Sequence, residues 1–233
     1  MKKYISMIAV YLLVFSLFLG GTYGGSHLIM VMAQSQPLER EHILIIDAGH
    51  GGEDGGATSC TGVLESTINL EIALRLDELF RLLGWKTVMT RREDISIYTK
   101  GETLAQKKVS DLKERVRIVN ETEDGFLISI HQNQFQESRY HGAQVFYNRN
   151  DNAQELAKQL QSELIRSVNV GSNRQAKQAS GIFLMEHIER PGILIECGFL
   201  SNPTEEARLR SPDYQKHLCC VIATAVTKYL SNT

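Results

Sequence analysis

Short apolar runs alternate with amphipathic segments between residues 42 and 230, and this alternation constrains the fold more than any other feature of the chain. The apolar runs predict strands at HILIIDAG (42–49), KTVMTR (86–91), FLISIHQN (126–133), HGAQVFYN (141–148) and ILIECGFL (193–200). Apolar residues at helical spacing predict helices near 66–84, 109–119, 152–168 and 212–230. Strands that alternate with helices indicate an α/β domain, in which a central and mostly parallel sheet is flanked by helices in a single three-layer arrangement.

This predicted domain covers residues 42–233, and residues 34–41 form a predicted linker in front of it. Residues 95–109 are polar and show no periodicity, so they are expected to be irregular. The sequence contains no internal repeat and no low-complexity tract, and it indicates no second folded domain.

The first 33 residues have the pattern of an export segment. Met1-Lys2-Lys3 precedes the apolar run IAVYLLVFSLFLG (8–20), and small residues follow near Ala33. A basic start, an apolar run and small residues are typical of a secretory signal peptide. The apolar character resumes at 28–32, which leaves an uncleaved membrane anchor as the alternative. Both interpretations place the remaining chain outside the cytoplasm, in contact with a membrane only through this segment if it is not cleaved.

Charge and cysteine usage exclude two classes of protein. The formal net charge is −2, which provides no electrostatic basis for binding nucleic acid. The four cysteines, Cys60, Cys197, Cys219 and Cys220, show no CxxC spacing. We therefore expect buried free thiols rather than a cysteine zinc site or a disulfide framework.

The stretch IDAGHGGEDGG (46–56) ends an apolar strand in a histidine surrounded by glycines. A glycine-rich loop after a strand can bind phosphate through its backbone N–H groups. It can also bring a ligating side chain close to a metal, since glycine tolerates dihedrals that other residues avoid. The phosphate-loop interpretation fails because the G-K-[ST] ending is missing. The G-x-S-x-G elbow of a serine hydrolase is missing as well.

Three potentially reactive side chains follow strand ends and are expected to converge. His50 comes just after the first strand, His131 lies at the end of FLISIH, and Glu196 lies late in ILIECG. Ligands of open α/β sheets bind beyond the carboxyl ends of the strands. Glu196 is also flanked by apolar residues, where a carboxylate is costly to bury without a partner or a function. This convergence favours a metal site.

His50 and His131 are the best ligand candidates among the seven histidines, and Glu65 is the candidate third ligand. Two histidines and one carboxylate leave a fourth position open, which is the arrangement of a catalytic zinc site. Zn²⁺ lowers the pKa of water and polarises carbonyl groups. Glu196 would then serve as proton acceptor and donor. Each residue also has a structural interpretation: a histidine at a strand end often only makes hydrogen bonds, and Glu65 suits the start of a helix. Asp47 and Asn133 could orient the ligands or simply cap loops.

At this point the sequence resembles the zinc-dependent N-acetylmuramoyl-L-alanine amidases. The motifs that carry the resemblance are IDAGHGGEDGGA, Glu65, SIHQN and ILIECGFLSNP, which occur in the family's order over residues 42–230. The resemblance implies an α/β fold with one Zn²⁺ held by His50, Glu65 and His131, and Glu196 as the catalytic carboxylate. The implied substrate is peptidoglycan, cut between the lactyl group of N-acetylmuramic acid and L-alanine.

The chain is most similar to the germination-specific amidases of spore formers. The insert after MTR, the helix SDLKERVRIVN and the stretch SGIFLMEHIERPGILIECGFLSNP carry this likeness. It implies removal of stem peptides in the spore cortex as the first step toward muramic-δ-lactam, in the cell wall or the intermembrane space of the developing spore. Gly181 and Leu184 are implied to line the substrate groove, although Ile182, Phe183 and Leu184 also fit a core strand. The chain departs from the family at Ala48, Gln132 and Gln134, and the two glutamines put fine substrate contacts in doubt.

Two alternatives remain open at this stage. A zinc peptidase that cuts within the stem peptide would need the same metal and carboxylate. A wall-binding module without activity is disfavoured, because all the candidate ligands and Glu196 are present. Peptidoglycan is the expected partner, and we also expect a protein that activates or targets the enzyme, since no binding repeats concentrate this domain on the wall.

Overall fold

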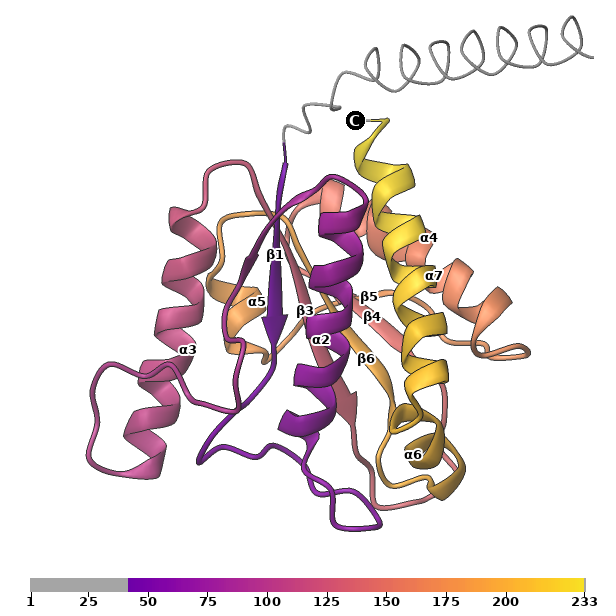
Figure 1. Ribbon diagram of the computed structural model, residues 1–233, viewed down its shortest axis with the longest axis horizontal. Helices are drawn as coiled ribbons and strands as arrows, with labels where there is room; N and C mark the ends of the chain where they lie inside the picture. The colour runs from indigo at the N-terminus through magenta and orange to yellow at the C-terminus, as the bar shows by residue number, and fades with distance from the viewer. Residues whose placement is uncertain (1–41, 233) are drawn as a thin grey trace, which may run out of the picture. The chain divides into compact units, whose positions relative to one another are not determined.

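The computed structural model describes residues 42–232, in which a six-stranded sheet lies between two layers of helices (Figure 1). The predicted export segment and linker, residues 1–41, lie outside the described residues. The strand order is β2-β1-β3-β6-β4-β5. The strands are β1 (Ile43–Ala48), β2 (Lys86–Met89), β3 (Gly125–Asn133), β4 (Gln144–Tyr147), β5 (Lys177–Gln178) and β6 (Gly192–Phe199). The predicted fold class is confirmed.

Most neighbouring strands are parallel. The pairs β1 with β2, β1 with β3, β3 with β6, and β4 with β5 run in the same direction, whereas β4 is antiparallel to β6. The carboxyl ends of β1, β3 and β6 therefore meet at one edge of the sheet. His131 of β3 is directly opposite Glu196 of β6, and Glu196 is directly opposite Gln144 of β4. This register places the three side chains in one row on the same face.

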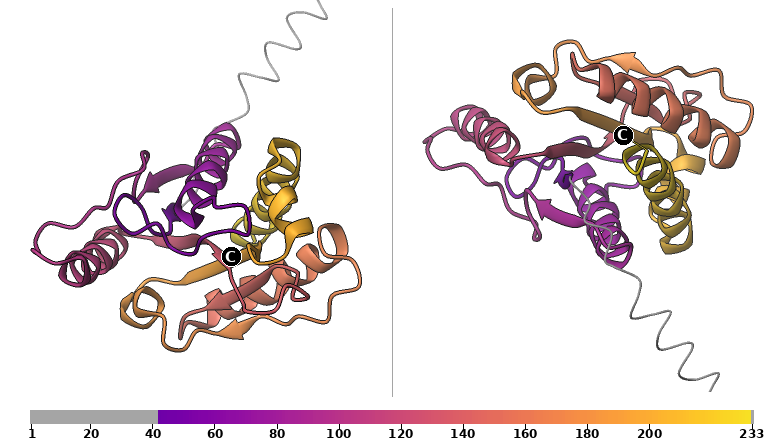
Figure 2. Two further views of the ribbon diagram at one scale, coloured as in Figure 1. Left: turned by 90° about the horizontal axis from the view of Figure 1, so that it is seen from below. Right: turned by 90° about the horizontal axis from the view of Figure 1, so that it is seen from above.

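The helices cover both faces of the sheet, as the two views along its edges show (Figure 2). They are α2 (Glu65–Leu82), α3 (Leu104–Glu121), α4 (Asp151–Ser167), α5 (Phe183–His187), α6 (Pro203–Leu209) and α7 (Pro212–Leu230). Helices α2, α4 and α7 pack on one face, and α3 and α5 on the other. Within residues 42–232, no helix is long and apolar enough to cross a membrane.

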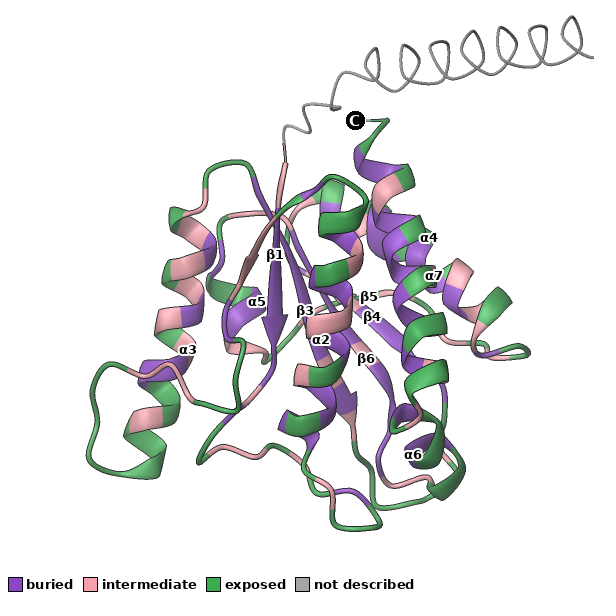
Figure 3. Ribbon diagram, in the orientation of Figure 1, coloured by how far each residue is buried: buried purple, intermediate pink, exposed green. Residues whose placement is uncertain are grey.

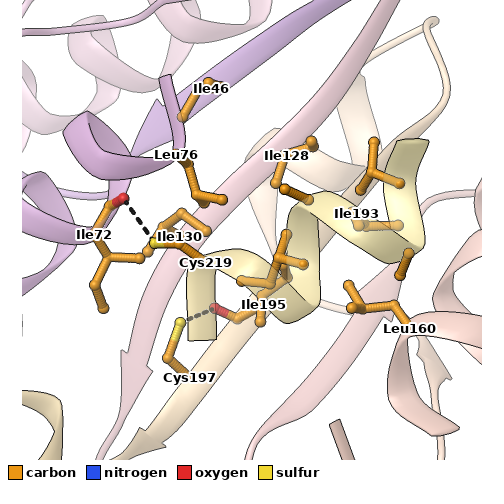
Figure 4. Packing of buried hydrophobic residues seen from close by; sticks show 14 of the residues in the cluster. Ile46, Ile72, Leu76, Ile128, Ile130, Leu160, Ile193, Ile195, Cys197 and Cys219 are labelled. Atoms are coloured by element: carbon orange, nitrogen blue, oxygen red, sulfur yellow. Dashed lines mark hydrogen bonds between the residues drawn. The ribbon is translucent and has the colours of Figure 1, made fainter. Parts of the chain in front are cut away.

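Each face of the sheet has its own apolar core. On the face of α2, α4 and α7, alternate strand residues such as Ile46, Ile128 and Ile193 pack against helix residues such as Leu76 and Leu160 (Figure 4). The smaller core on the other face joins Ile45, Leu127 and Leu194 to α3 and α5. The strands are consequently buried on both faces, while the outer faces of the helices are exposed (Figure 3). This burial explains the nearly continuous apolar runs in the sequence.

The four cysteines are free, but the prediction that they are buried is wrong for two of them, because Cys60 lies in the loop before α2 and Cys220 on the exposed side of α7. Cys197 and Cys219 are buried, and Cys60 and Cys220 are exposed. The two buried thiols act as small apolar groups that donate weak hydrogen bonds to the carbonyl oxygens of Ile195 and Ile72 (Figure 4).

Four short features differ from the sequence prediction. Helix α3 begins at Leu104, inside the segment expected to be irregular, because Thr103 and Gln106 form a reciprocal capping box. Residues 183–187 form the helix α5, not a core strand. Strand β5 and helix α6 were not predicted. Both are short, and their few residues show little periodicity.

Candidate active site

Three side chains from different elements converge at the carboxyl edge of the sheet. His50 follows β1, Glu65 is the first residue of α2, and His131 belongs to β3. One potential ligand atom from each residue lies within 4.8 Å of the other two. The His50 and His131 rings stand edge to face with centroids 5.0 Å apart. The residues predicted as ligands are therefore brought together.

The glycines of the β1–α2 loop explain how the two histidines approach each other. A Cβ atom on Gly49 would lie 2.2 Å from Nε2 of His131, and one on Gly56 would lie 2.6 Å from Oε2 of Glu65. Real Cβ atoms do not come this close to other atoms, so larger residues would displace the cluster. His50 itself has a φ of 60°, a left-handed conformation that is uncommon for a residue with a side chain. The surrounding structure must hold this conformation in place.

Glu65 is buried and its carboxylate is held on all sides. Oε1 accepts hydrogen bonds from the backbone N–H of Gln132 at 3.1 Å and from Nδ2 of Asn69 at 3.2 Å. It also lies 3.0 Å from Nδ1 of His131. Oε2 accepts from the backbone N–H of Ala57 at 2.9 Å and lies 3.3 Å from Nε2 of His50. Position 65 was therefore more than the start of a helix.

The charges of the cluster depend on one another. Burial alone would raise the pKa of Glu65, but hydrogen bonds with His131 and His50 outweigh it and keep the pKa well below its usual value. Burial would lower the pKa of His50, whereas its contacts with Asp54 and Glu65 raise it to about 9. The site thus favours positive charge between its carboxylates. Nitrogen and carboxylate donors around such a point fit a divalent transition metal.

Glu196 faces this cluster as a separate carboxylate. Its register opposite His131 places it beside the cluster, and Oε2 is buried without a hydrogen-bond partner. Burial raises the pKa of Glu196 to about 7, although the neighbouring His131 partly offsets the effect. A buried carboxyl oxygen without a partner is costly, so it points to a group that the protein alone does not supply. A carboxyl group with a pKa near neutrality is suited to both accept and donate protons.

Asp47 does not contact the ligands directly. It is fully buried and accepts hydrogen bonds from Thr90 at 2.8 Å and Ser129 at 2.6 Å, and it forms an ion pair with Arg115 of α3. Arg115 in turn donates to the carbonyl oxygen of His50 at 2.8 Å. Arg115 therefore links Asp47 to the backbone of His50, and the orienting role of Asp47 stays a prediction.

The other candidate residues have different places. Asn133 ends β3, and its carbonyl oxygen accepts from the backbone N–H of Leu200 at 2.8 Å. Gly181 is exposed in the left-handed region, with a φ of 73°. Leu184 is buried in the core beneath α5. Both Gly181 and Leu184 line the cleft of about 380 Å³ that also contains His50 and Glu196. A larger cavity of about 790 Å³ between α4 and α7 contains none of the candidate residues.

The sequence analysis missed three residues that support the cluster. Besides Arg115, Asp54 lies 2.9 Å from Nδ1 of His50. Asn69 donates to both Glu65 and the carbonyl oxygen of Gly49, at 3.2 and 3.1 Å. Asn69 could have been found, because it follows Glu65 by one helical turn on the apolar face of α2.

An α/β domain that carries a two-histidine, one-carboxylate cluster and a separate buried carboxylate at the carboxyl edge of its sheet is the framework of a hydrolase. The family model described as N-acetylmuramoyl-L-alanine amidase matches residues 44–228, and the chain belongs to this family. Such enzymes hydrolyse the amide bond that joins N-acetylmuramic acid to L-alanine in peptidoglycan.

Individual relatives agree with this assignment. The chain is 37% identical over 191 residues to the germination-specific N-acetylmuramoyl-L-alanine amidase of Bacillus subtilis, covering 81% of this chain and 80% of that protein. Among solved structures, it resembles the CwlD amidase from Clostridioides difficile in complex with the GerS lipoprotein, with a TM-score of 0.79, 39% identity, and coverage of 82% and 100%. An N-acetylmuramoyl-L-alanine amidase from Clostridium difficile 630 gives a TM-score of 0.72, 30% identity, and coverage of 84% and 100%.

Proposed function

We propose that this amidase is zinc-dependent and acts on the peptidoglycan of the spore cortex. It removes stem peptides from N-acetylmuramic acid, which is the first step toward muramic-δ-lactam and prepares the cortex for germination. The germination-specific name of the Bacillus subtilis relative supports the cortex as the site of action. The donor set of His50, Glu65 and His131 supports zinc.

The proposed chemistry divides between the cluster and Glu196. His50, Glu65 and His131 would hold Zn²⁺, and the ion would supply a lower pKa for water and polarisation of the scissile carbonyl. Glu196 accepts a proton from the attacking water and returns it to the departing alanine nitrogen. Gly181 and Leu184 line the groove in which the substrate lies.

The observation that carries this proposal is the position of Glu196. A structural carboxylate would pair with a neighbouring donor, yet Oε2 of Glu196 is buried without one and lies beside the cluster. Asp47 shows the contrast on the same face, since it is satisfied by Arg115, Thr90 and Ser129.

Digestion of purified cortex peptidoglycan followed by mass spectrometry tests the proposal. We expect free stem peptides that begin with L-alanine, together with glycan strands that carry unsubstituted lactyl groups. Products cut within the stem peptide would instead identify a zinc peptidase. Digestion must stop with a chelator and resume when Zn²⁺ is added back.

The relatives also suggest a location and a partner. We propose that the N-terminal segment exports the chain, so that the catalytic domain acts in the cell wall or the intermembrane space of the developing spore. The CwlD amidase was solved in complex with a lipoprotein, and we propose a partner of this kind here. A partner that binds the zinc-loaded state more tightly raises zinc affinity by the same factor, because the two equilibria are linked.

The partner proposal is tested by titrating the purified chain with Zn²⁺ in the presence and in the absence of a lipoprotein of the GerS kind. We expect tighter zinc binding and faster release of stem peptide in its presence. Tight stoichiometric zinc and full turnover by the chain alone would contradict this proposal and leave the amidase proposal intact.

A further inference from the structure

A second cleft lies next to the row of side chains that contains Glu196, on the far side from His50. The row His131, Glu196 and Gln144 crosses β3, β6 and β4, and its members share one face of the sheet. Gln144 is also part of the wall of a cleft of about 710 Å³ between the 139–144 and 171–177 segments. A molecule bound at Glu196 therefore needs to extend by only one strand to enter this cleft.

Arg174 is the fixed cation of this cleft. Its Nε donates to the carbonyl oxygen of His141 at 2.9 Å, and one terminal nitrogen donates to Oε1 of Gln144 at 2.8 Å. The guanidinium carbon lies 4.7 Å from the centroid of the Phe199 ring. Three contacts from different segments thus hold a half-buried side chain that would otherwise be free to move. An arginine ordered in this way loses little conformational entropy when it binds a ligand.

All of the protein acceptors of Arg174 that lie in the cleft are neutral. Burial lowers the pKa of Arg174, and the opposite electrostatic effect of the Glu205 carboxylate is smaller. The oxygens of Glu205 accept hydrogen bonds from the backbone N–H groups of Gly142 and Phe199, at 2.9 to 3.0 Å. A partly buried cation without a paired anion favours binding of a negatively charged ligand.

The rest of the cleft has the same sign of charge. Its described lining contains Arg139, His141, Arg174 and Lys177 and no aspartate or glutamate. Arg139 pairs with Glu137 at 2.7 Å outside the lining, whereas Lys177 forms no ion pair among the described residues. Two cations, Arg174 and Lys177, are consequently available to an anion. By contrast, the cleft at His50 has charges of both signs, since Asp47, Asp54, Asp111 and Glu196 line it together with Lys108 and Arg115.

We propose that the Arg174–Lys177 cleft binds a free carboxylate of the stem peptide during hydrolysis. This inference rests on the proposed function and adds the feature of the substrate that the enzyme recognises. At the muramic acid residue that is being cut, the glycan has no carboxylate to offer, because its lactyl carboxyl is part of the scissile amide. The peptide, whose acidic residues follow L-alanine, supplies the free carboxylates at that residue. The cleft therefore places the leaving group on the β4–β5 side of Glu196.

The test compares two synthetic muramyl peptides that differ only in the stem peptide, which has free carboxylates in one and carboxamides in the other. The wild-type enzyme is expected to have a kcat/KM about 10-fold or more higher for the free acid, mainly through KM, as one charge-assisted hydrogen bond supplies. The variants Arg174→Gln and Lys177→Gln should lose most of this preference, because their kcat/KM falls mainly for the free acid. Arg149→Gln removes the same charge from an exposed position outside the cleft and should keep the preference.

The outcomes separate this inference from the proposed function. Equal cleavage of both peptides by wild type, or an unchanged preference in both cleft variants, would overturn the cleft and leave the amidase intact. Failure to cut either peptide between the lactyl group and alanine would overturn the proposed function itself. If Arg174→Gln does not fold, Lys177→Gln decides alone, because the exposed Lys177 makes no side-chain hydrogen bond in the described structure.

Discussion

The guanidinium group of Arg115 holds the backbone of His50, since a terminal nitrogen donates to the His50 carbonyl oxygen at 2.8 Å. A second nitrogen donates to the carbonyl oxygen of Ala48 at 2.9 Å, and Nε pairs with Asp111 at 2.6 Å. His50 is in the left-handed region, so this clamp maintains a conformation that the chain would not favour by itself. A helix on one face of the sheet thereby sets the direction of a candidate metal ligand.

Replacing Arg115 with methionine should weaken both the fold and the metal site. Asp47 and Asp111 would remain buried without their partner, which costs about 3–5 kcal/mol of the free energy of unfolding. Zinc affinity of the folded protein should fall by about 10- to 100-fold, as for other residues that orient ligands. Urea unfolding and zinc titration measure the two effects. Asp77→Asn, which weakens the pairing of the buried Asp77 carboxylate with the half-exposed Arg81 and Arg92 outside the cluster, should lower stability and leave zinc affinity unchanged.

Gly49→Ala should remove zinc binding although it adds only one methyl group. The new Cβ would lie 2.2 Å from the His131 ring. The ring is rigid, so it can avoid the clash only by moving as a whole. We expect zinc affinity to fall by about 100-fold or more, which is comparable to the loss of a ligand. Gly84→Ala is the control, because it strains a positive φ but meets open space. Equal zinc affinity of Gly49→Ala and wild type would show that the site tolerates displacement of the ring.

His131→Ala should abolish stoichiometric zinc, since it removes one of the three proposed protein ligands. Elemental analysis of the purified variant is the measurement, with one zinc per chain expected for wild type. His141→Ala serves as the control, because His141 is exposed and lies outside the cluster. Full zinc occupancy of His131→Ala would exclude His131 from the ligand set.

Glu196→Gln should retain zinc and stability but lose activity. The amide has nearly the same shape and cannot take the proton from water, so kcat should fall by about 10²- to 10⁴-fold. The rate of stem-peptide release, measured at equal zinc content, checks this expectation. Turnover within a few-fold of wild type would mean that Glu196 has a structural role only.

The buried ion pair of Asp47 should appear in the acid dependence of stability. Burial alone would raise the pKa of Asp47, but Arg115 and Ser129 have the larger, opposite effect and lower the pKa from 3.8 to about 2. Because the pKa is lower in the folded state, the stabilisation is present above about pH 4 and is lost as the pH falls toward 2. It amounts to about 2 kcal/mol. In zinc-free protein, the difference in free energy of unfolding between wild type and Asp47→Asn should shrink by this amount between pH 5 and pH 2. A constant difference would contradict the assignment.

The amino-acid sequence alone predicts the class of fold and the edge of the sheet at which the site lies. Continuous apolar runs and 3.6-residue periods depend only on neighbouring residues, so they identified the main strands and helices. Parallel strands bring their carboxyl ends to one edge, which is why His50, His131 and Glu196 could be expected together. The short elements α5, α6 and β5 escaped, because a few residues carry too little periodicity.

The side chains that contact His50, His131 and Glu196 could be identified only from the tertiary structure. Arg115 is 65 residues from His50 in the sequence, and Arg174 is 30 residues from Gln144. Their partners depend on the strand order and on which face each helix covers. No local pattern encodes these pairings, since a surface arginine and a buried arginine look alike in the sequence. The register of β6 between β3 and an antiparallel β4 likewise emerged only on folding, and it places Glu196 between His131 and Gln144, which lines the Arg174–Lys177 cleft.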